Sequence, residues 1–168
     1  GVGDTAIRNY DKWQEIRVNM DTLCEGREPN TSVKLFGKEF RFPFFAGPVG
    51  AVNLHYSDKY DDISYNQVLV STCKSCGIAA FTGDGTNPLV MQAAADAIKE
   101  NEGFGIPTIK PWNLDTIKEK LSLVIDADAF AVAMDVDAAG LPFLKNMNPP
   151  AGSKSVDELR EIISLSNI

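Results

Sequence analysis

The stretch Ala129-Phe130-Ala131-Val132-Ala133-Met134-Asp135-Val136-Asp137 decides the fold of this 168-residue chain. It is a run of small and branched apolar residues that ends in two carboxylates. A run that is apolar on both faces is typical of a strand buried in a parallel sheet. Polar residues directly after such a strand lie at its carboxyl end, where parallel α/β folds bind their ligands. The stretch therefore predicts a buried strand and the edge of a binding site.

Three earlier stretches share this pattern, at residues 42–50, 77–85 and 106–112. The helical patterns that alternate with the strands occupy 57–75, 87–101, a segment that opens at Asn113 or Asp115, and a segment that opens with a capping box at Ser155. The order βαβαβαβα predicts an α/β fold, either an open sheet or part of a (β/α)₈ barrel. In both cases the four strand ends meet at one mouth.

Two further elements are predicted before the first of these strands. A helical period runs over residues 4–20, behind a cap at Asp4 or Thr5. Residues 33–42 alternate around a Gly37-Lys38 turn, which predicts a short hairpin. We expect this hairpin to close the bottom of a barrel.

The composition narrows the classes of function. A net charge of −7 and an isoelectric point near 4.7 argue against a nucleic-acid partner or an anionic membrane surface. No apolar run approaches the roughly 20 residues that span a bilayer. Three cysteines in 168 residues favour a reducing cytoplasm over a disulfide framework. Cys73 and Cys76 have redox spacing but end a helix, so we expect both to be buried small residues.

The loop and strand ends carry side chains with two interpretations each. The small residues at 47–51 let a flat or phosphorylated ligand approach backbone amides, or they form a plain strand-to-helix turn. Lys110 places a positive charge against an anionic ligand, or it is a solvated lysine. Trp112 stacks on a ring or closes the pocket, or it packs in the core.

The two aspartates after the last strand, the single histidine and the following loop are the remaining candidates for a functional role. We expect only one of Asp135 and Asp137 to face a central ligand, and the favoured one is Asp137. No metal site is predicted, because a divalent ion would also need Asp84 or another oxygen donor. His55 is the only histidine in the sequence. It is either the base of a mechanism that needs a histidine or an exposed loop residue. A long loop rich in Pro and Asn is expected over 138–152.

From about Tyr10 onward the chain resembles the FMN-dependent α-hydroxy-acid oxidase and dehydrogenase family, which includes glycolate oxidase, lactate oxidase and flavocytochrome b2. The entry segment at 31–43 is similar to the family's. The family's Ala-Pro-Thr-Ala motif along the flavin is matched by Gly47-Pro48-Val49-Gly50. Its flavin-contacting Ser or Thr after the second strand is matched by Thr82. Lys110-Pro111-Trp112 stands where the family has Gln-Leu-Tyr.

The resemblance implies a role for each matched residue. The implied cofactor is FMN, and the implied cofactor-binding residues are Pro48, Val49, Gly50, Thr82, Lys110 and Asp135. Asp135 replaces a flavin-contacting Thr, while Asp137 matches the Asp that orients the catalytic His. Trp112 takes the place of the substrate-contacting Tyr. The family's substrate-binding Arg has no clean match, and Lys145 is a nearby candidate.

The resemblance also implies an incomplete site. The family's flavin-binding Lys, its His-Gly-Gly-Arg catalytic motif and its FMN-phosphate loops have no counterpart in these 168 residues. We therefore expect the N-terminal half, (βα)₄, of a TIM (β/α)₈ barrel at 43–168, behind an N-terminal helix and hairpin at 1–42. Such a half is expected to hold FMN weakly or not at all and to be inactive alone.

The expected partners follow from this interpretation. They are a small α-hydroxy acid and either the missing C-terminal half-barrel or a second copy that associates across the open sheet edge. Two alternatives remain open. One is a non-flavin TIM-barrel lyase or isomerase that uses Lys110 and the Asp pair. The other is a non-catalytic half-barrel that needs a partner half.

Overall fold

The computed structural model describes residues 2–168 and divides into two compact units, Gly1–Asn30 and Thr31–Ile168. The hairpin lies in the second unit, together with the sheet. The predicted boundary between the N-terminal elements (1–42) and the half-barrel (43–168) stays a prediction.

The first unit contains one helix, α1 (Asp4–Glu15). It ends at Glu15 rather than near residue 20, because Ile16 takes an extended backbone conformation. The predicted cap at Asp4 or Thr5 is wrong. Gly3 occupies the cap position with φ of 80°, and no side chain there accepts a hydrogen bond from the first turn.

The second unit opens with an antiparallel hairpin of β1 (Val33–Leu35) and β2 (Lys38–Phe40). Its turn residues are Phe36 and Gly37, with φ of 50° and 74°. Two positive φ angles in succession match the type I′ turn whose twist suits a hairpin. The predicted hairpin is confirmed, with its turn one residue earlier than expected.

Phe40 fixes the hairpin against the rest of the second unit. Its ring is fully buried. The ring centroid lies 4.6 Å from that of Phe45, 5.4 Å from that of Phe104 and 5.7 Å from that of Phe130, all in tilted arrangements. The three partners lie one to three residues before a strand position, so the hairpin packs at the amino ends of the sheet strands.

The sheet is parallel and has the order β3 (Phe81–Thr82), β4 (Ile106–Ile109), β5 (Ala133–Met134). Ala46 extends this order by one parallel bridge to Ala80. All four predicted strand stretches therefore pair in sequence order. The first is reduced to a single bridge, so the sheet is narrower at that edge than the sequence indicates.

Helices follow each strand position. Their bounds are α2 (Val52–His55), α3 (Asp62–Cys76), α4 (Pro88–Glu100), α5 (Leu114–Asp126), η1 (Val136–Gly140), α6 (Pro142–Lys145) and α7 (Val156–Ser164). The predicted caps at Asn87, Asn113 and Ser155 all accept a backbone N–H. The predicted loop at 138–152 contains α6 and most of η1. No helix among residues 2–168 is long and apolar enough to cross a membrane.

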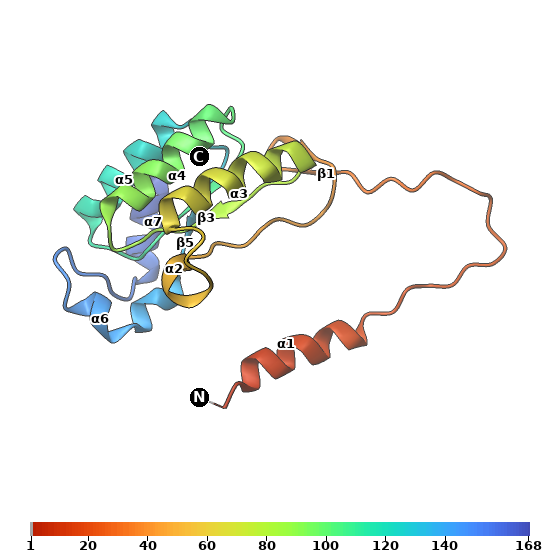
Figure 1. Ribbon diagram of the computed structural model, residues 1–168, viewed down its shortest axis with the longest axis horizontal. Helices are drawn as coiled ribbons and strands as arrows, with labels where there is room; N and C mark the ends of the chain where they lie inside the picture. The colour runs from red at the N-terminus through yellow and green to blue at the C-terminus, as the bar shows by residue number, and fades with distance from the viewer. Residues whose placement is uncertain (1) are drawn as a thin grey trace. The chain divides into compact units, whose positions relative to one another are not determined.

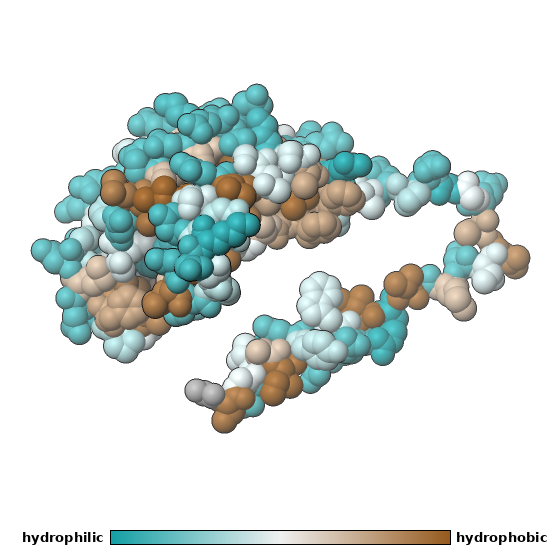
Figure 2. Space-filling view, in the orientation of Figure 1, coloured by the Kyte–Doolittle hydropathy of each residue, from teal (hydrophilic) through white to brown (hydrophobic). Residues whose placement is uncertain are grey.

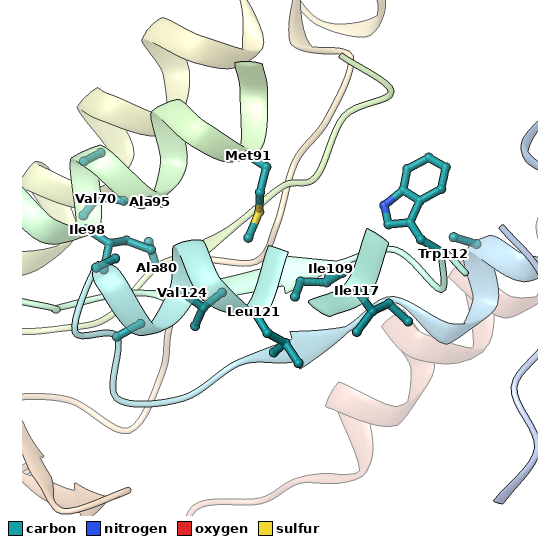
Figure 3. Packing of buried hydrophobic residues seen from close by; sticks show 14 of the residues in the cluster. Val70, Ala80, Met91, Ala95, Ile98, Ile109, Trp112, Ile117, Leu121 and Val124 are labelled. Atoms are coloured by element: carbon teal, nitrogen blue, oxygen red, sulfur yellow. The ribbon is translucent and has the colours of Figure 1, made fainter. Parts of the chain in front are cut away.

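The main core lies between the sheet and the layer formed by α3, α4 and α5, which run side by side in Figure 1. Figure 3 shows how the apolar side chains of these helices meet those of the strands. The fully buried members include Val70, Ala80, Met91, Ile98, Ile117 and Val124. The outer sides of α4 and α5 are mainly hydrophilic (Figure 2). Burial of one face of each helix is what holds the strand ends in place.

Gly103 is predicted to tolerate no side chain. Its φ is +73°, its N–H closes the end of α4 on the Ile98 carbonyl, and an added Cβ would overlap the backbone carbonyl of Asp128. We expect Gly103→Ala to lower the free energy of unfolding in urea by about 2 kcal/mol. Gly140→Ala is the control, because nothing lies within 4 Å of its added Cβ. Equal stability of the two variants would contradict this account.

Candidate functional site

A cavity of about 510 Å³ opens at the carboxyl ends of the parallel strands. Its lining comes from all four strand positions and from the loop after the first. The lining residues are Phe45, Gly47, Pro48, Val49, Gly50, Phe81, Gly83, Asp84, Thr108, Lys110, Ala133, Met134 and Asp135. The shared mouth expected from the sequence is therefore present.

The loop at 47–50 lies directly against the end of β3. A Cβ added at Gly83 would be 2.7 Å from the Val49 carbonyl oxygen, so only glycine permits this approach. Beyond the loop, the Asp62 carboxylate accepts the backbone N–H of Val52 at 2.7 Å. The loop is thus held at both ends, with its backbone along the cavity.

Strand β4 presents alternate residues to the cavity, as the two-residue period of a strand requires. Thr108 and Lys110 line the cavity, while Ile109 is buried in the core. Thr108 is 7% exposed, and its hydroxyl has no hydrogen-bond partner among residues 2–168. It was not singled out from the sequence, although a threonine within an apolar strand is a usable signal, because buried hydroxyls are normally paired.

Asp84 connects three elements through one buried carboxylate. Its Oδ2 accepts the backbone N–H of Lys110 at 3.0 Å and the indole N–H of Trp112 at 2.7 Å. Its Oδ1 accepts the Lys120 ammonium at 2.8 Å, with the two side chains 1% and 11% exposed. Asp84 therefore joins the ends of β3 and β4 to α5. The sequence suggested it only as an additional metal donor.

Three predicted site residues do not line this cavity, namely Trp112, Thr82 and Asp137. Trp112 is 3% exposed and belongs to the core, where it lines a second cavity of about 480 Å³ beside α4 and α5. Its burial agrees with the core-packing interpretation. Thr82 is fully buried and does not line the cavity, because its neighbours Phe81 and Gly83 take the cavity-facing positions.

Asp135 and Asp137 lie together, and the expectation that Asp137 is the one that faces the cavity is wrong. The chain turns into η1 at Val136, which brings the two carboxyls into contact. Their mutual hydrogen bond raises the pKa of Asp135 and lowers the pKa of Asp137. The Lys110 ammonium lies 3.6 Å from the Asp135 carboxylate. Asp135 lines the cavity, whereas Asp137 is exposed beside it.

The remaining candidates lie outside the cavity. His55 and Lys145 are exposed on α2 and α6, and neither lines it. Cys73 is buried, which raises the pKa of its thiol, but Cys76 is exposed, contrary to expectation. Within residues 2–168 no group of three or more His, Cys, Asp or Glu side chains is arranged to hold a metal ion.

Loss of the Asp84 charge is predicted to destabilise the second unit. Asp84→Asn leaves the buried Lys120 ammonium without a counter-ion, so we expect a loss of about 3 kcal/mol in urea unfolding. Asp157→Asn serves as the control. It breaks an ion pair to Arg160 whose side chains are 90% and 73% exposed, and we expect almost no change. Similar losses of unfolding free energy in the two variants would contradict the greater importance of the buried pair.

The contact between Asp135 and Asp137 leads to a second prediction, which a ¹³C NMR titration of the Asp135 carboxyl would check. Lys110→Met removes a nearby cation and should raise the pKa of Asp135 further, whereas Asp137→Asn removes a nearby carboxylate and should lower it. Since the folded pKa is above its ordinary value, the stability that protonated Asp135 contributes is lost as the pH rises through that pKa. Unchanged titrations in both variants would be the contrary result.

Solved structures with a similar fold include three flavoenzymes. An arginine-to-lysine variant of flavocytochrome b2 has a TM-score of 0.76 at 12% identity and matches 100% of this chain and 44% of its own. A variant of mandelate oxidase bound to (S)-mandelic acid has a TM-score of 0.72 at 12% identity, with 100% and 52% covered. The monotopic membrane protein (S)-mandelate dehydrogenase has a TM-score of 0.58 at 14% identity, with 77% and 32% covered. This chain thus spans about half of these proteins or less.

No curated protein matches the chain significantly. The family of FMN-dependent dehydrogenases matches residues 1–148, most of the sequence. FMN is the cofactor of that family, and a mandelate oxidase structure with the same fold contains an FMN adduct. The mixed α/β fold with its parallel sheet agrees with part of a flavoenzyme barrel. The chain belongs to the FMN-dependent dehydrogenase family.

Proposed function

We propose that this chain forms one side of the flavin site of an oxidoreductase that converts small α-hydroxy acids of the lactate and glycolate class to α-keto acids. The observation that carries the proposal is the cavity at the carboxyl ends of the parallel strands. Backbone of residues 47–50 lines it on one side, and among residues 2–168 Lys110 is the one cation that lines it. Membership of the family supplies the cofactor.

The lining suits the flat ring system of a flavin. Phe45, Phe81 and Met134 give apolar surface, and an added Cβ at Gly47 or Gly50 would meet nothing within 4 Å, which leaves open space beside the backbone. Flat conjugated ligands are commonly held between apolar side chains and a few polar groups at their edges. The residues present therefore fit the ring.

The polar groups at the ring's edge would be the Thr108 hydroxyl, which lacks a partner in the described chain, and Asp135. Pro48, Val49 and Gly50 are proposed to contact the ring through their backbone. Within the described part of the chain, the cavity lining offers the phosphate of FMN a single cation, Lys110. A segment outside this chain is proposed to hold the phosphate.

The chain's own residues position the reactants. When bound, the flavin accepts two electrons from the acid. Asp137 is proposed to orient a histidine base, as in the resemblance. His55 is exposed on α2 and does not line the cavity, so the base is proposed to come from another segment. Trp112 acts as a positioning residue through Asp84, rather than by stacking on a ligand.

We propose a (βα)₄ half-barrel whose missing half, or a second copy, packs at the β5 edge. The support is an apolar cavity of about 280 Å³ at β5, lined mainly by aliphatic residues of β4, β5, α5 and α7. On α7, Ile163 is 73% exposed. Apolar surface beside an unpaired strand edge is typical of an interface.

Flavin binding by the 168-residue chain tests the proposal. We expect riboflavin and FMN to bind with similar, weak affinity, because the phosphate adds no contact. Gly50→Leu should weaken both by about tenfold by occupying ring space, which fluorescence quenching would measure. Gly152→Leu is the control, since its Cβ also meets nothing within 4 Å but lies outside the cavity.

Absence of flavin binding, or binding that Gly50→Leu and Gly152→Leu leave alike, would count against a flavin site. In that case the lyase or isomerase alternative would rest on Lys110 and its 3.6 Å approach to Asp135.

A further inference from the structure

Thr108 of β4 and Lys110, the residue directly after β4, line the same cavity. Thr108 is buried, whereas the side chain of Lys110, two residues further toward the carboxyl end, keeps 19% of its surface exposed. Two residues along a strand span about 6.6 Å, roughly the width of a small carboxylic acid. A ring held at the level of Thr108 therefore leaves the Lys110 ammonium at the level where a second, smaller ligand would lie.

The charges around Lys110 leave its ammonium incompletely compensated. Asp84 also lines the cavity, but its carboxylate is taken by Lys120 and two N–H donors. Of the described residues, Asp135 is the one other charged residue in the lining. Its carboxylate lies 3.6 Å from the Lys110 ammonium, which exceeds the roughly 2.8 Å of a strong charged hydrogen bond. Asp135 also shares a hydrogen bond with Asp137. An ammonium carries three donors, so Lys110 has capacity for another acceptor.

We propose that Lys110 binds the carboxylate of the α-hydroxy acid, with Asp135 and Asp137 as the counter-ions that the acid's carboxylate partly displaces. This inference rests on the proposed function for the identity of the acid, but the anion site itself rests on Lys110. It assigns Lys110 to the substrate instead of the flavin edge. It also replaces Trp112, which is buried away from the cavity, as the substrate-contacting residue of this strand.

The arrangement determines the direction of two substitutions. Loss of the ammonium removes the attraction for the carboxylate. Loss of the Asp137 charge removes a like charge close to the bound acid and should strengthen binding. The two changes therefore act oppositely at one site, which a general effect on folding would not produce.

The test uses the isotope-labelled 168-residue chain and NMR titration with L-lactate, with neutral lactamide as the matched ligand. We expect lactate to shift the Lys110 ¹³Cε and Asp135 ¹³Cγ signals saturably, and lactamide not to do so. Lys110→Met should raise the lactate dissociation constant by about tenfold or more, and Lys110→Arg should largely retain binding. Asp137→Asn should lower the constant. Lys118→Met, on an exposed lysine of α5 that does not line the cavity, should leave it unchanged.

Three results would overturn the proposal: an equal response to lactamide, wild-type lactate binding in Lys110→Met with an intact amide spectrum, or no saturable shift at Lys110. The outcome is separable from that of the proposed function. Lactate binding at Lys110 without any flavin binding would remove the function and keep the anion site. Flavin binding without a lactate response would remove this inference alone.

Discussion

The carboxylate of Asp84 is the interaction on which the site depends. It is buried at the end of β3 and neutralised by Lys120 from α5, and it accepts two further N–H groups from the end of β4. A buried charge is costly unless it is paired and hydrogen-bonded, so this carboxylate fixes where the second and third strands end relative to the helix layer. Lys110 reaches the mouth because its own backbone N–H is held there.

The elements with local signals could be predicted from the sequence. The caps at Asn87, Asn113 and Ser155 depend on neighbouring residues only, and the structure confirms them. Three of the four apolar runs form strands of the parallel sheet, and the first is reduced to a single bridge. The cap of α1 could not be obtained in this way, because Gly3 takes a left-handed conformation and no side chain accepts from the first turn. The hairpin turn moved by one residue because Phe36, a non-glycine residue, adopts positive φ.

The site was predictable as a place but not as a set of contacts. Strand ends in a parallel sheet converge, so Pro48, Val49, Gly50, Lys110 and Asp135 could be expected at one cavity, and the structure brings them there. The side of the sheet that Thr82 faces depends on the phase of its strand. The direction of Trp112 depends on its hydrogen bond to Asp84, which lies far away in the sequence. The contact between Asp135 and Asp137 depends on the 3₁₀ turn at Val136. Such features are set by tertiary packing, which composition and spacing do not encode.

The Phe40 cluster has a consequence for the order in which the chain folds. The hairpin itself is local, but its central ring packs on Phe104 and Phe130, which come much later in the chain. During synthesis from the amino end, the ribosome must release the fourth strand before Phe40 can find its last partner. Until then the Phe40 ring has only its nearer partners to pack against, so the hairpin reaches its final packing late in synthesis.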